Sequence, residues 1–174
     1  EQIADADLWA GLLARSGLGL FAVEYPGYGL SAKGTATEAT MFESAHRALE
    51  YLRTTLQVPK ERTLLLGQSL GSGVATEMAI RGFGSKLVLV SPYTSIPDVA
   101  QLAFPFLPAK LLVRDTFDNL KRASAVHVPT LVIHGRVDEV IPVRLGQRLG
   151  AAIQGARVEL VDANHNDIVT SEIT

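Results

Sequence analysis

The feature that most constrains this chain is the pattern Gly67-x-Ser69-x-Gly71. The apolar run at residues 63–66 predicts a short buried strand before it, and apolar residues at helical spacing follow it. A strand, a sharp turn and a helix form the context that a nucleophile elbow requires, with a strained serine flanked by residues that lack bulk. We therefore expect the Ser69 hydroxyl at the carboxyl end of a sheet, with the Leu70 N–H at the helix start facing a developing oxyanion. A glycine-rich turn that holds a chance serine is the alternative.

The rest of the chain alternates between predicted strands and helices. Apolar runs predict strands at residues 20–23, 63–66, 86–90, 130–134 and 157–161. Helical spacing predicts helices at residues 3–16, at 42–56 behind a capping box of Thr35 and Glu38, after Ser69, and from Pro142 to Ile153. Such apolar strands favour an α/β fold, a mostly parallel sheet with helices on both faces. We expect a single domain over residues 1–174, with a cap-like, proline-rich excursion at 91–126 that holds short helices at 96–106 and 111–120.

Composition excludes several classes of function. The chain has 174 residues, of which 47% are hydrophobic and 20% charged, and this suits one globular core. The net charge of −2 gives no reason to expect nucleic acid or an anionic membrane as a partner. Without cysteine there are no disulfides, thiolate metal sites or cysteine nucleophiles. No apolar run suits a membrane span or a signal peptide, which favours a cytoplasmic location.

A serine hydroxyl is a poor nucleophile unless a base lies within hydrogen-bond reach. His46 lies mid-helix, His127 precedes its predicted strand, and His134 is followed at once by Gly135 in a turn. His165 follows the last predicted strand at the carboxyl edge of the sheet. This position favours His165 as the base over a solvated loop histidine.

The acid that orients the base is expected between the serine and the histidine in the chain. Asp138 and Glu139 directly follow the carboxyl end of a predicted strand, whereas Asp98, Asp115 and Asp118 do not. We favour Asp138, with Glu139 as the alternative. A helix N-cap is the competing structural role for Asp138.

These segments resemble the alpha/beta-hydrolase superfamily along nearly the whole chain. The resemblance is carried by residues 67–71 (GQSLG), 134–142 (HGRVDEVIP) and 164–167 (NHND). Residues 25–31 (YPGYGLS) and 91–96 (SPYTSI) resemble a branch of small, short-cap serine hydrolases, some of them acyl-protein thioesterases that remove palmitoyl groups. The resemblance implies Ser69 as nucleophile, His165 as base, Asp138 as its orienter and Leu70 N–H as an oxyanion donor, with no metal or organic cofactor.

The chain departs from the family pattern at its two ends. Family members carry further strands first, and then a His-Gly motif with a second oxyanion donor. In the family's sheet, the strand that is missing here lies between the two strands predicted at 20–23 and 63–66. This chain begins where that motif should have ended, and it stops nine residues past His165, before most of the last helix. We therefore expect a fragment that is unstable or inactive in isolation.

The leading functional hypothesis is a hydrolase of carboxylic esters or acyl thioesters that acts on a small-molecule acyl substrate. Candidate pocket residues are Tyr28, Tyr93 and Phe104, and the excursion at 91–126 either lines an acyl pocket or is a plain packed connection. A serine peptidase of the dipeptidyl- or aminopeptidase kind stays open, as does a catalytically silent binding protein on the same fold.

Overall fold

The fold is built on one parallel sheet at the centre of the chain. The computed structural model describes residues 6–168. Its strands are β1 (Leu64–Gln68), β2 (Lys86–Val90), β3 (Thr130–Gly135) and β4 (Arg157–Val161), in the spatial order β1-β2-β3-β4. All neighbours are parallel, and the register pairs Gln68 with Val90 and Val90 with Ile133. The carboxyl ends of the strands therefore meet at one edge, and so do the residues that follow them.

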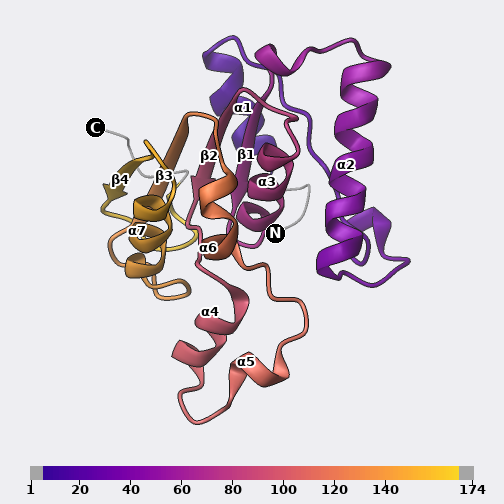
Figure 1. The fold of residues 1–174 in the computed structure, drawn as a ribbon. Helices are drawn as coiled ribbons and strands as arrows, with labels where there is room; N and C mark the ends of the chain where they lie inside the picture. The colour runs from indigo at the N-terminus through magenta and orange to yellow at the C-terminus, as the bar shows by residue number, and fades with distance from the viewer. Residues whose placement is uncertain (1–5, 169–174) are drawn as a thin grey trace.

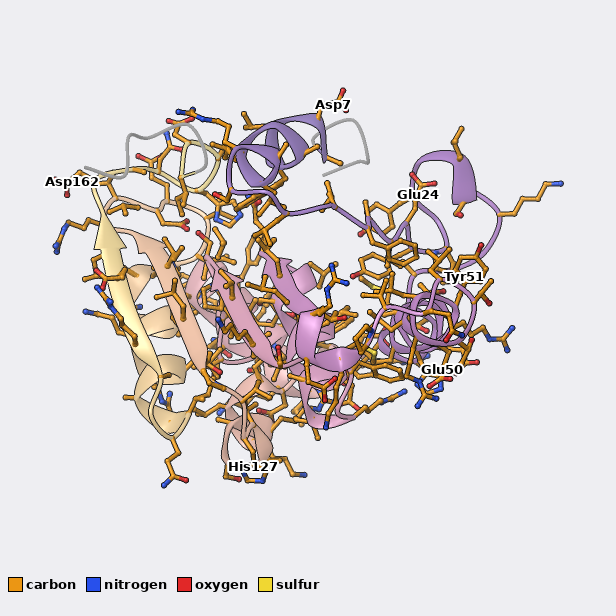
Figure 2. The ribbon with its side chains drawn as sticks, turned by 90° about the horizontal axis from the view of Figure 1, so that it is seen from above. Asp7, Glu24, Glu50, Tyr51, His127 and Asp162 are labelled. Atoms are coloured by element: carbon orange, nitrogen blue, oxygen red, sulfur yellow. The ribbon has the colours of Figure 1, made fainter. Side chains whose placement is uncertain are left out.

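Helices cover the two faces of the sheet, as predicted, but unequally (Figure 1). Helices α3 (Gly71–Ile80) and α7 (Val143–Ala152) pack on one face, α2 (Glu38–Thr54) packs outside α3, and α1 (Ala6–Arg15) lies on the other face. The first face holds the main core, in which Leu89, Val132 and Leu149 have 0% exposure. On the second face, Trp9 of α1 packs against a small cluster that includes Val90. Charged side chains such as Glu50 and Asp162 lie at the outside of the molecule (Figure 2).

The strands predicted at 63–66, 86–90, 130–134 and 157–161 form within two residues of the expected bounds. The strand predicted at 20–23 was wrong, because residues 18–25 form no ladder. Within residues 6–168, β1 pairs with β2 alone, and a hollow separates its outer edge from residues 18–25. A strand needs a neighbour for its backbone N–H and C=O groups, and Leu20 and Phe21 are left 41% and 40% exposed.

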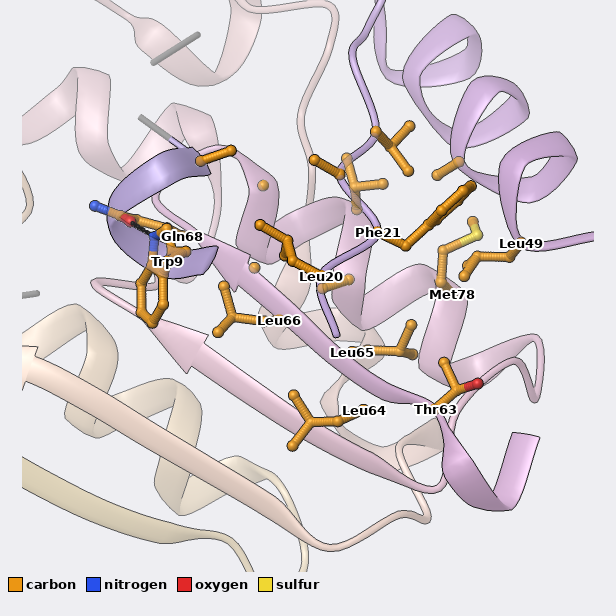
Figure 3. Close-up of a pocket in the computed structure, with 18 of the residues that line it drawn as sticks. Trp9, Leu20, Phe21, Leu49, Thr63, Leu64, Leu65, Leu66, Gln68 and Met78 are labelled. Atoms are coloured by element: carbon orange, nitrogen blue, oxygen red, sulfur yellow. Dashed lines mark hydrogen bonds between the residues drawn. The ribbon is translucent and has the colours of Figure 1, made fainter. Parts of the chain in front are cut away.

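This hollow, which we call the β1 groove, has a volume of about 1520 Å³. It runs between residues 18–25, α1 and α2 on one side and β1 and α3 on the other (Figure 3). Apolar side chains line it, Ser69 and His165 lie at its border, and Trp9 Nε1 donates a hydrogen bond of 3.2 Å to Gln68 Oε1. The β1 groove therefore adjoins the carboxyl edge of the sheet.

Helix α1 matches the prediction at 3–16 over its described part, and residues 3–5 lie outside the described residues. Three other helix predictions need correction. The capping box of α2 uses Thr37 and Thr40 in place of Thr35 and Glu38, since each threonine hydroxyl accepts the other's backbone N–H. The helix predicted at 96–106 ends early, as α4 (Ile96–Ala103). The continuous helix predicted at 111–120 is absent: α5 (Ala109–Leu112) and α6 (Asn119–Arg122) flank an irregular stretch in which Phe117 has a φ of 39°. The short helices Gly29–Ser31, Lys60–Arg62 and Ala123–Ala125 are 3-10 turns.

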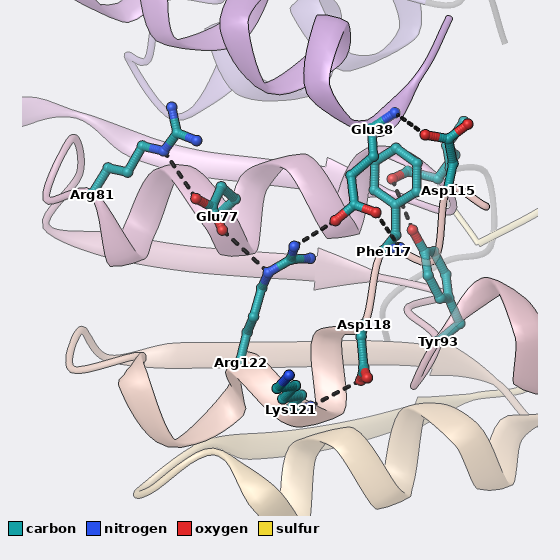
Figure 4. Close-up of polar contacts among 10 residues, drawn as sticks. Glu38, Glu77, Arg81, Tyr93, Asp115, Phe117, Asp118, Lys121 and Arg122 are labelled. Atoms are coloured by element: carbon teal, nitrogen blue, oxygen red, sulfur yellow. Dashed lines mark hydrogen bonds and ion pairs between the residues drawn. The ribbon is translucent and has the colours of Figure 1, made fainter.

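Arg122, near the end of the excursion at 91–126, forms ion pairs with α2 and α3 (Figure 4). Arg122 Nε lies 3.2 Å from Glu77 Oε2 of α3, and the Arg122 guanidinium also pairs with Glu38 of α2. Burial would raise the pKa of Glu38, but hydrogen bonds from Arg122 and the Phe117 N–H outweigh it and lower the pKa. Glu38 thus serves this ion-pair network and not the predicted cap. The middle of the excursion, which holds α4 and α5, projects away from the sheet (Figure 1).

No helix within residues 6–168 combines the length and apolar character that crossing a bilayer requires.

Candidate active site

The structure brings Ser69, Asp138 and His165 together at the carboxyl edge of the sheet. Ser69 directly follows β1, Asp138 lies in the loop after β3, and His165 lies in the loop after β4. His165 Nε2 is 3.0 Å from Ser69 Oγ, and His165 Nδ1 is 2.8 Å from Asp138 Oδ2. One imidazole therefore joins the hydroxyl to the carboxylate through its two nitrogens.

Ser69 has the strained backbone that the sequence predicts. Its φ is 49°, in the left-handed region that L-residues rarely occupy, and its N–H donates to the Val90 carbonyl at 2.9 Å. A Cβ at Gly67 would collide with the Gly71 carbonyl and lie 2.7 Å from the Ala75 Cβ, whereas a Cβ at Gly71 would meet nothing within 4 Å. The expected need for small residues on both sides of Ser69 therefore holds for Gly67 and not for Gly71.

Asp138 is held as a buried anion by donors on both oxygens. Its Oδ1 accepts the backbone N–H groups of Val140 at 2.9 Å and Ile141 at 2.7 Å, and its Oδ2 accepts the Ser91 hydroxyl at 2.8 Å. Burial would raise the pKa of Asp138, but the hydrogen bonds from Ile141, His165 and Ser91 outweigh burial and lower it. Glu139, the alternative acid, is exposed to solvent.

A second histidine supports the loop that carries Asp138. His134, at the end of β3, has 0% exposure, and its Nε2 lies 2.8 Å from the Ile141 carbonyl and 3.4 Å from Asp138 Oδ2. Because a carbonyl only accepts, Nε2 carries the proton, while Nδ1 faces Gly146 of α7 without a partner in the described structure. Burial lowers the pKa of His134, so the ring is neutral near pH 7.

The two remaining histidines lie elsewhere. His127 is exposed ahead of β3 (Figure 2), as expected. His46 packs edge-on against Phe83, which borders the main core, with ring centroids 5.1 Å apart.

The residues predicted for the pocket do not gather at one place. Tyr28 lines the β1 groove. Tyr93 is 1% exposed, burial raises the pKa of its hydroxyl, and that hydroxyl donates to the Leu70 carbonyl at 3.4 Å. Phe104 is 61% exposed at the end of α4, away from the β1 groove. The Leu70 N–H, predicted as an oxyanion donor, belongs to the N-cap residue of α3.

Sequence reasoning gave no role to Ser91, although this serine follows β2 just as Ser69 follows β1. The signal was available in the predicted strand at 86–90, whose carboxyl end places Ser91 at the same edge. Within residues 6–168, no cluster of three or more His, Cys, Asp or Glu residues is arranged to hold a metal ion.

The comparisons with known proteins agree with this architecture. Residues 4–125 match the model of the "Alpha/beta hydrolase family". An uncharacterized protein of Mycobacterium tuberculosis is 35% identical over 153 residues, which cover 87% of this chain and 54% of that protein. Human alpha/beta hydrolase domain-containing protein 17B is 32% identical over 167 residues, which cover 94% of this chain and 56% of that protein. The chain thus spans about half the length of these curated relatives.

Solved structures share the fold at lower identity. An alpha-beta hydrolase from Vibrio vulnificus superposes with a TM-score of 0.78 at 22% identity, over 93% of this chain and 62% of that one. The thioesterase domain from the curacin biosynthetic pathway gives 0.73 at 16% identity, over 98% and 84%. A monoacylglycerol lipase from Paleococcus ferrophilus gives 0.68 at 20%, over 94% and 80%. From the family match over 4–125 and the fold these structures share, we conclude that the chain belongs to the alpha/beta hydrolase family.

Proposed function

We propose that this chain carries the catalytic residues of a serine hydrolase that cleaves carboxylic esters or acyl thioesters. One observation supports the proposal above the others: the His165 imidazole lies 3.0 Å from the Ser69 hydroxyl and 2.8 Å from the Asp138 carboxylate. A hydroxyl, an imidazole and a carboxylate that contact one another in this order form the arrangement that activates serine for attack on a carbonyl.

In the proposed reaction, His165 Nε2 takes the Ser69 proton as Ser69 Oγ attacks the acyl carbonyl carbon. The imidazole becomes imidazolium, and its Nδ1–H donates to Asp138 Oδ2, so the carboxylate fixes the tautomer and stabilises the positive charge. Nε2 then gives its proton to the departing alcohol or thiol, and an acyl-enzyme on Ser69 remains. Water attacks the acyl-enzyme with His165 again as the base, and the acid product leaves.

The developing oxyanion would be stabilised by the Leu70 N–H. Leu70 immediately follows Ser69 and is the N-cap residue of α3, so its N–H lies at the positive end of the helix dipole. Such donors act on charge that develops during the reaction.

Two features support an acyl substrate. The β1 groove reaches Ser69 and is lined by leucines and aromatic rings, including Tyr28 and Phe21. Two proteins that share the fold are named a thioesterase domain and a monoacylglycerol lipase. The roles of Tyr93 and Phe104 as pocket residues, and of residues 91–126 as a cap, stay predictions.

Covalent labelling with a fluorescent fluorophosphonate tests the proposal, because this reagent reports an activated serine without knowledge of the substrate. Because the sequence predicts that the chain alone is unstable or inactive, the test uses the full-length protein that contains it. We expect that protein to label, and we expect Ser69→Ala and His165→Ala to lose labelling while they keep the wild-type circular dichroism spectrum. On a short-chain acyl ester, Ser69→Ala should lower kcat by roughly 10⁴- to 10⁶-fold.

The matched control is Ser72→Ala, which removes a buried hydroxyl that has no hydrogen-bond partner in the described structure. It should label at the wild-type rate. Labelling that persists in Ser69→Ala, or a folded wild type that never labels, would refute the proposed chemistry. Relative rates on matched ester, thioester and aminoacyl-amide substrates then define the leaving group.

A further inference from the structure

After each of the strands β1 to β4 comes a residue whose side chain takes part in one connected chain of hydrogen bonds. Ser69 follows β1, Asp138 follows β3 and His165 follows β4. The strand between β1 and β3 is β2, and the residue that follows it is Ser91, which has 0% exposure. Ser91 thus lies between the strand that carries the hydroxyl and the strand that carries the carboxylate.

The Ser91 hydroxyl contacts the carboxylate oxygen that faces the imidazole. Ser91 Oγ donates to Asp138 Oδ2 at 2.8 Å, and the same oxygen lies 2.8 Å from His165 Nδ1. The backbone N–H groups of Val140 and Ile141 hold only the other oxygen, Oδ1. The backbone of the loop therefore fixes one end of the carboxylate, and the Ser91 hydroxyl fixes the end that meets the base.

The strained backbone of Ser91 indicates that its hydroxyl has a role at this position. Its φ is 45°, a conformation that favours glycine, and its N–H donates to the Ile133 carbonyl at 2.9 Å. Glycine would adopt this backbone with less strain, but it would leave Asp138 Oδ2 without this donor. The hydroxyl is the group that a strained serine supplies here and a relaxed glycine does not.

We propose that Ser91 is a positioning residue for the proposed hydrolysis: its hydroxyl holds Asp138 Oδ2 in line with His165 Nδ1. The inference rests on the proposed function. Without the hydroxyl, the carboxylate keeps its Oδ1 bonds, and apart from His165 only His134 Nε2, at the longer distance of 3.4 Å, remains beside Oδ2 among the described residues. The carboxylate can then turn about its Oδ1 bonds, so the imidazole loses its fixed orientation. A misaligned general base slows the chemical step and leaves substrate binding unchanged.

Two substitutions separate this role from a purely structural one. Ser91→Gly removes the hydroxyl and relieves the strain, whereas Ser91→Thr keeps a hydroxyl and adds strain, because a β-branched residue at positive φ is strongly disfavoured. We expect Ser91→Gly to lower the fluorophosphonate labelling rate, and kcat on a short-chain ester, by about 10- to 100-fold, the effect of losing one hydrogen bond to a charged group, with KM unchanged. Ser91→Thr should lower the melting temperature and label faster than Ser91→Gly.

If Ser91→Thr does not fold, Ser91→Ala takes its place. Alanine lacks the hydroxyl and keeps the strain, so positioning predicts that it labels as slowly as Ser91→Gly despite a lower melting temperature. Labelling rates that follow the melting temperatures would overturn the inference, as would wild-type kinetics in Ser91→Gly. Absence of labelling in the folded wild-type protein would remove the proposed function, and this inference with it. Wild-type labelling that Ser69→Ala abolishes and Ser91→Gly leaves unchanged would remove this inference alone.

Discussion

The sheet has a closed side, at the central strands β2 and β3, and an open side, at its β1 edge. The two differ in how completely they bury similar residues. On the side of β2 and β3, Leu89 and Val132 have 0% exposure beneath α3 and α7. At the other side, Leu64 of β1 is 39% exposed, and Leu20 and Phe21 across the β1 groove are 41% and 40% exposed. All five side chains are strongly apolar, so apolar character alone does not decide which segment becomes a strand. A neighbour that can accept and donate backbone hydrogen bonds is also required.

The candidate active site lies across the boundary between these two sides. Ser91 and Asp138 follow strands that have neighbours on both sides, whereas Ser69 follows β1, which within residues 6–168 has a neighbour on one side. The acid part of the site is therefore supported by the closed core, and the hydroxyl part borders the β1 groove. Three predictions test this contrast.

The largest expected effect compares one leucine from each side. Leu89→Ala should lower the free energy of unfolding by about 2–5 kcal/mol, the usual cost of a cavity in a closed core. Leu20→Ala should cost less than about 1 kcal/mol, because that side chain keeps much of its contact with water. Urea denaturation midpoints of the two variants provide the measurement. Equal losses would mean that residues 18–25 are buried in solution and that the β1 groove is closed.

An intermediate effect is expected at the turn on the boundary. Gly67→Ala places a Cβ against the Gly71 carbonyl and Ala75, so it should destabilise the protein by about 1–3 kcal/mol and reduce labelling of Ser69. Gly71→Ala meets open space and should change stability by no more than about 0.5 kcal/mol. Thermal unfolding of the pair, read beside their labelling rates, checks this. If the two variants behave alike, the close approach of strand and helix at Gly67 is not what shapes the turn.

The smallest effect is a pH slope on the closed side. Burial lowers the pKa of His134 from its ordinary value of 6.5, so the unfolded chain binds a proton there that the folded protein does not. The resulting stability is present above about pH 6.5 and is lost as pH falls through that value toward the lowered pKa. Asp138, whose pKa is lowered from 3.8, adds a further loss only at more acid pH.

The His134→Gln variant isolates this contribution. Glutamine can keep a donor near the Ile141 carbonyl but does not titrate, so the urea midpoint should fall less between about pH 7 and 5 than in the wild type. The groups that face the His134 ring are Asp138, His165 and the Ile141 carbonyl, with Gly146 of α7 against Nδ1. A wild-type slope in the variant would assign the pH dependence to another group.

The sequence was most informative where residue type and position along a strand act together. The turn at Ser69, the loop of Asp138 and the loop of His165 were each predicted from a strand end, and the parallel register brings them to one edge. The prediction at 20–23 failed because strand formation there depends on a neighbour, which local apolar character does not reveal. Glu38 likewise pairs with Arg122, which lies 84 positions away in the chain, and does not form the predicted cap. The contact of Ser91 with Asp138 spans 47 positions and depends on the order of β2 and β3 in the sheet, which spacing alone does not specify.

The backbone bonds at the ends of β1 and β2 have a consequence for motion. The N–H groups of Ser69 and Ser91 donate to the carbonyls of Val90 and Ile133, each at 2.9 Å, so the ladder of the sheet continues into both strained serines. Reorienting either hydroxyl through its backbone requires opening that ladder, which belongs to the slowest and most cooperative motions of a domain. Alignment of these groups is therefore fixed when the chain folds, and a ligand that arrives need not supply the ordering entropy again.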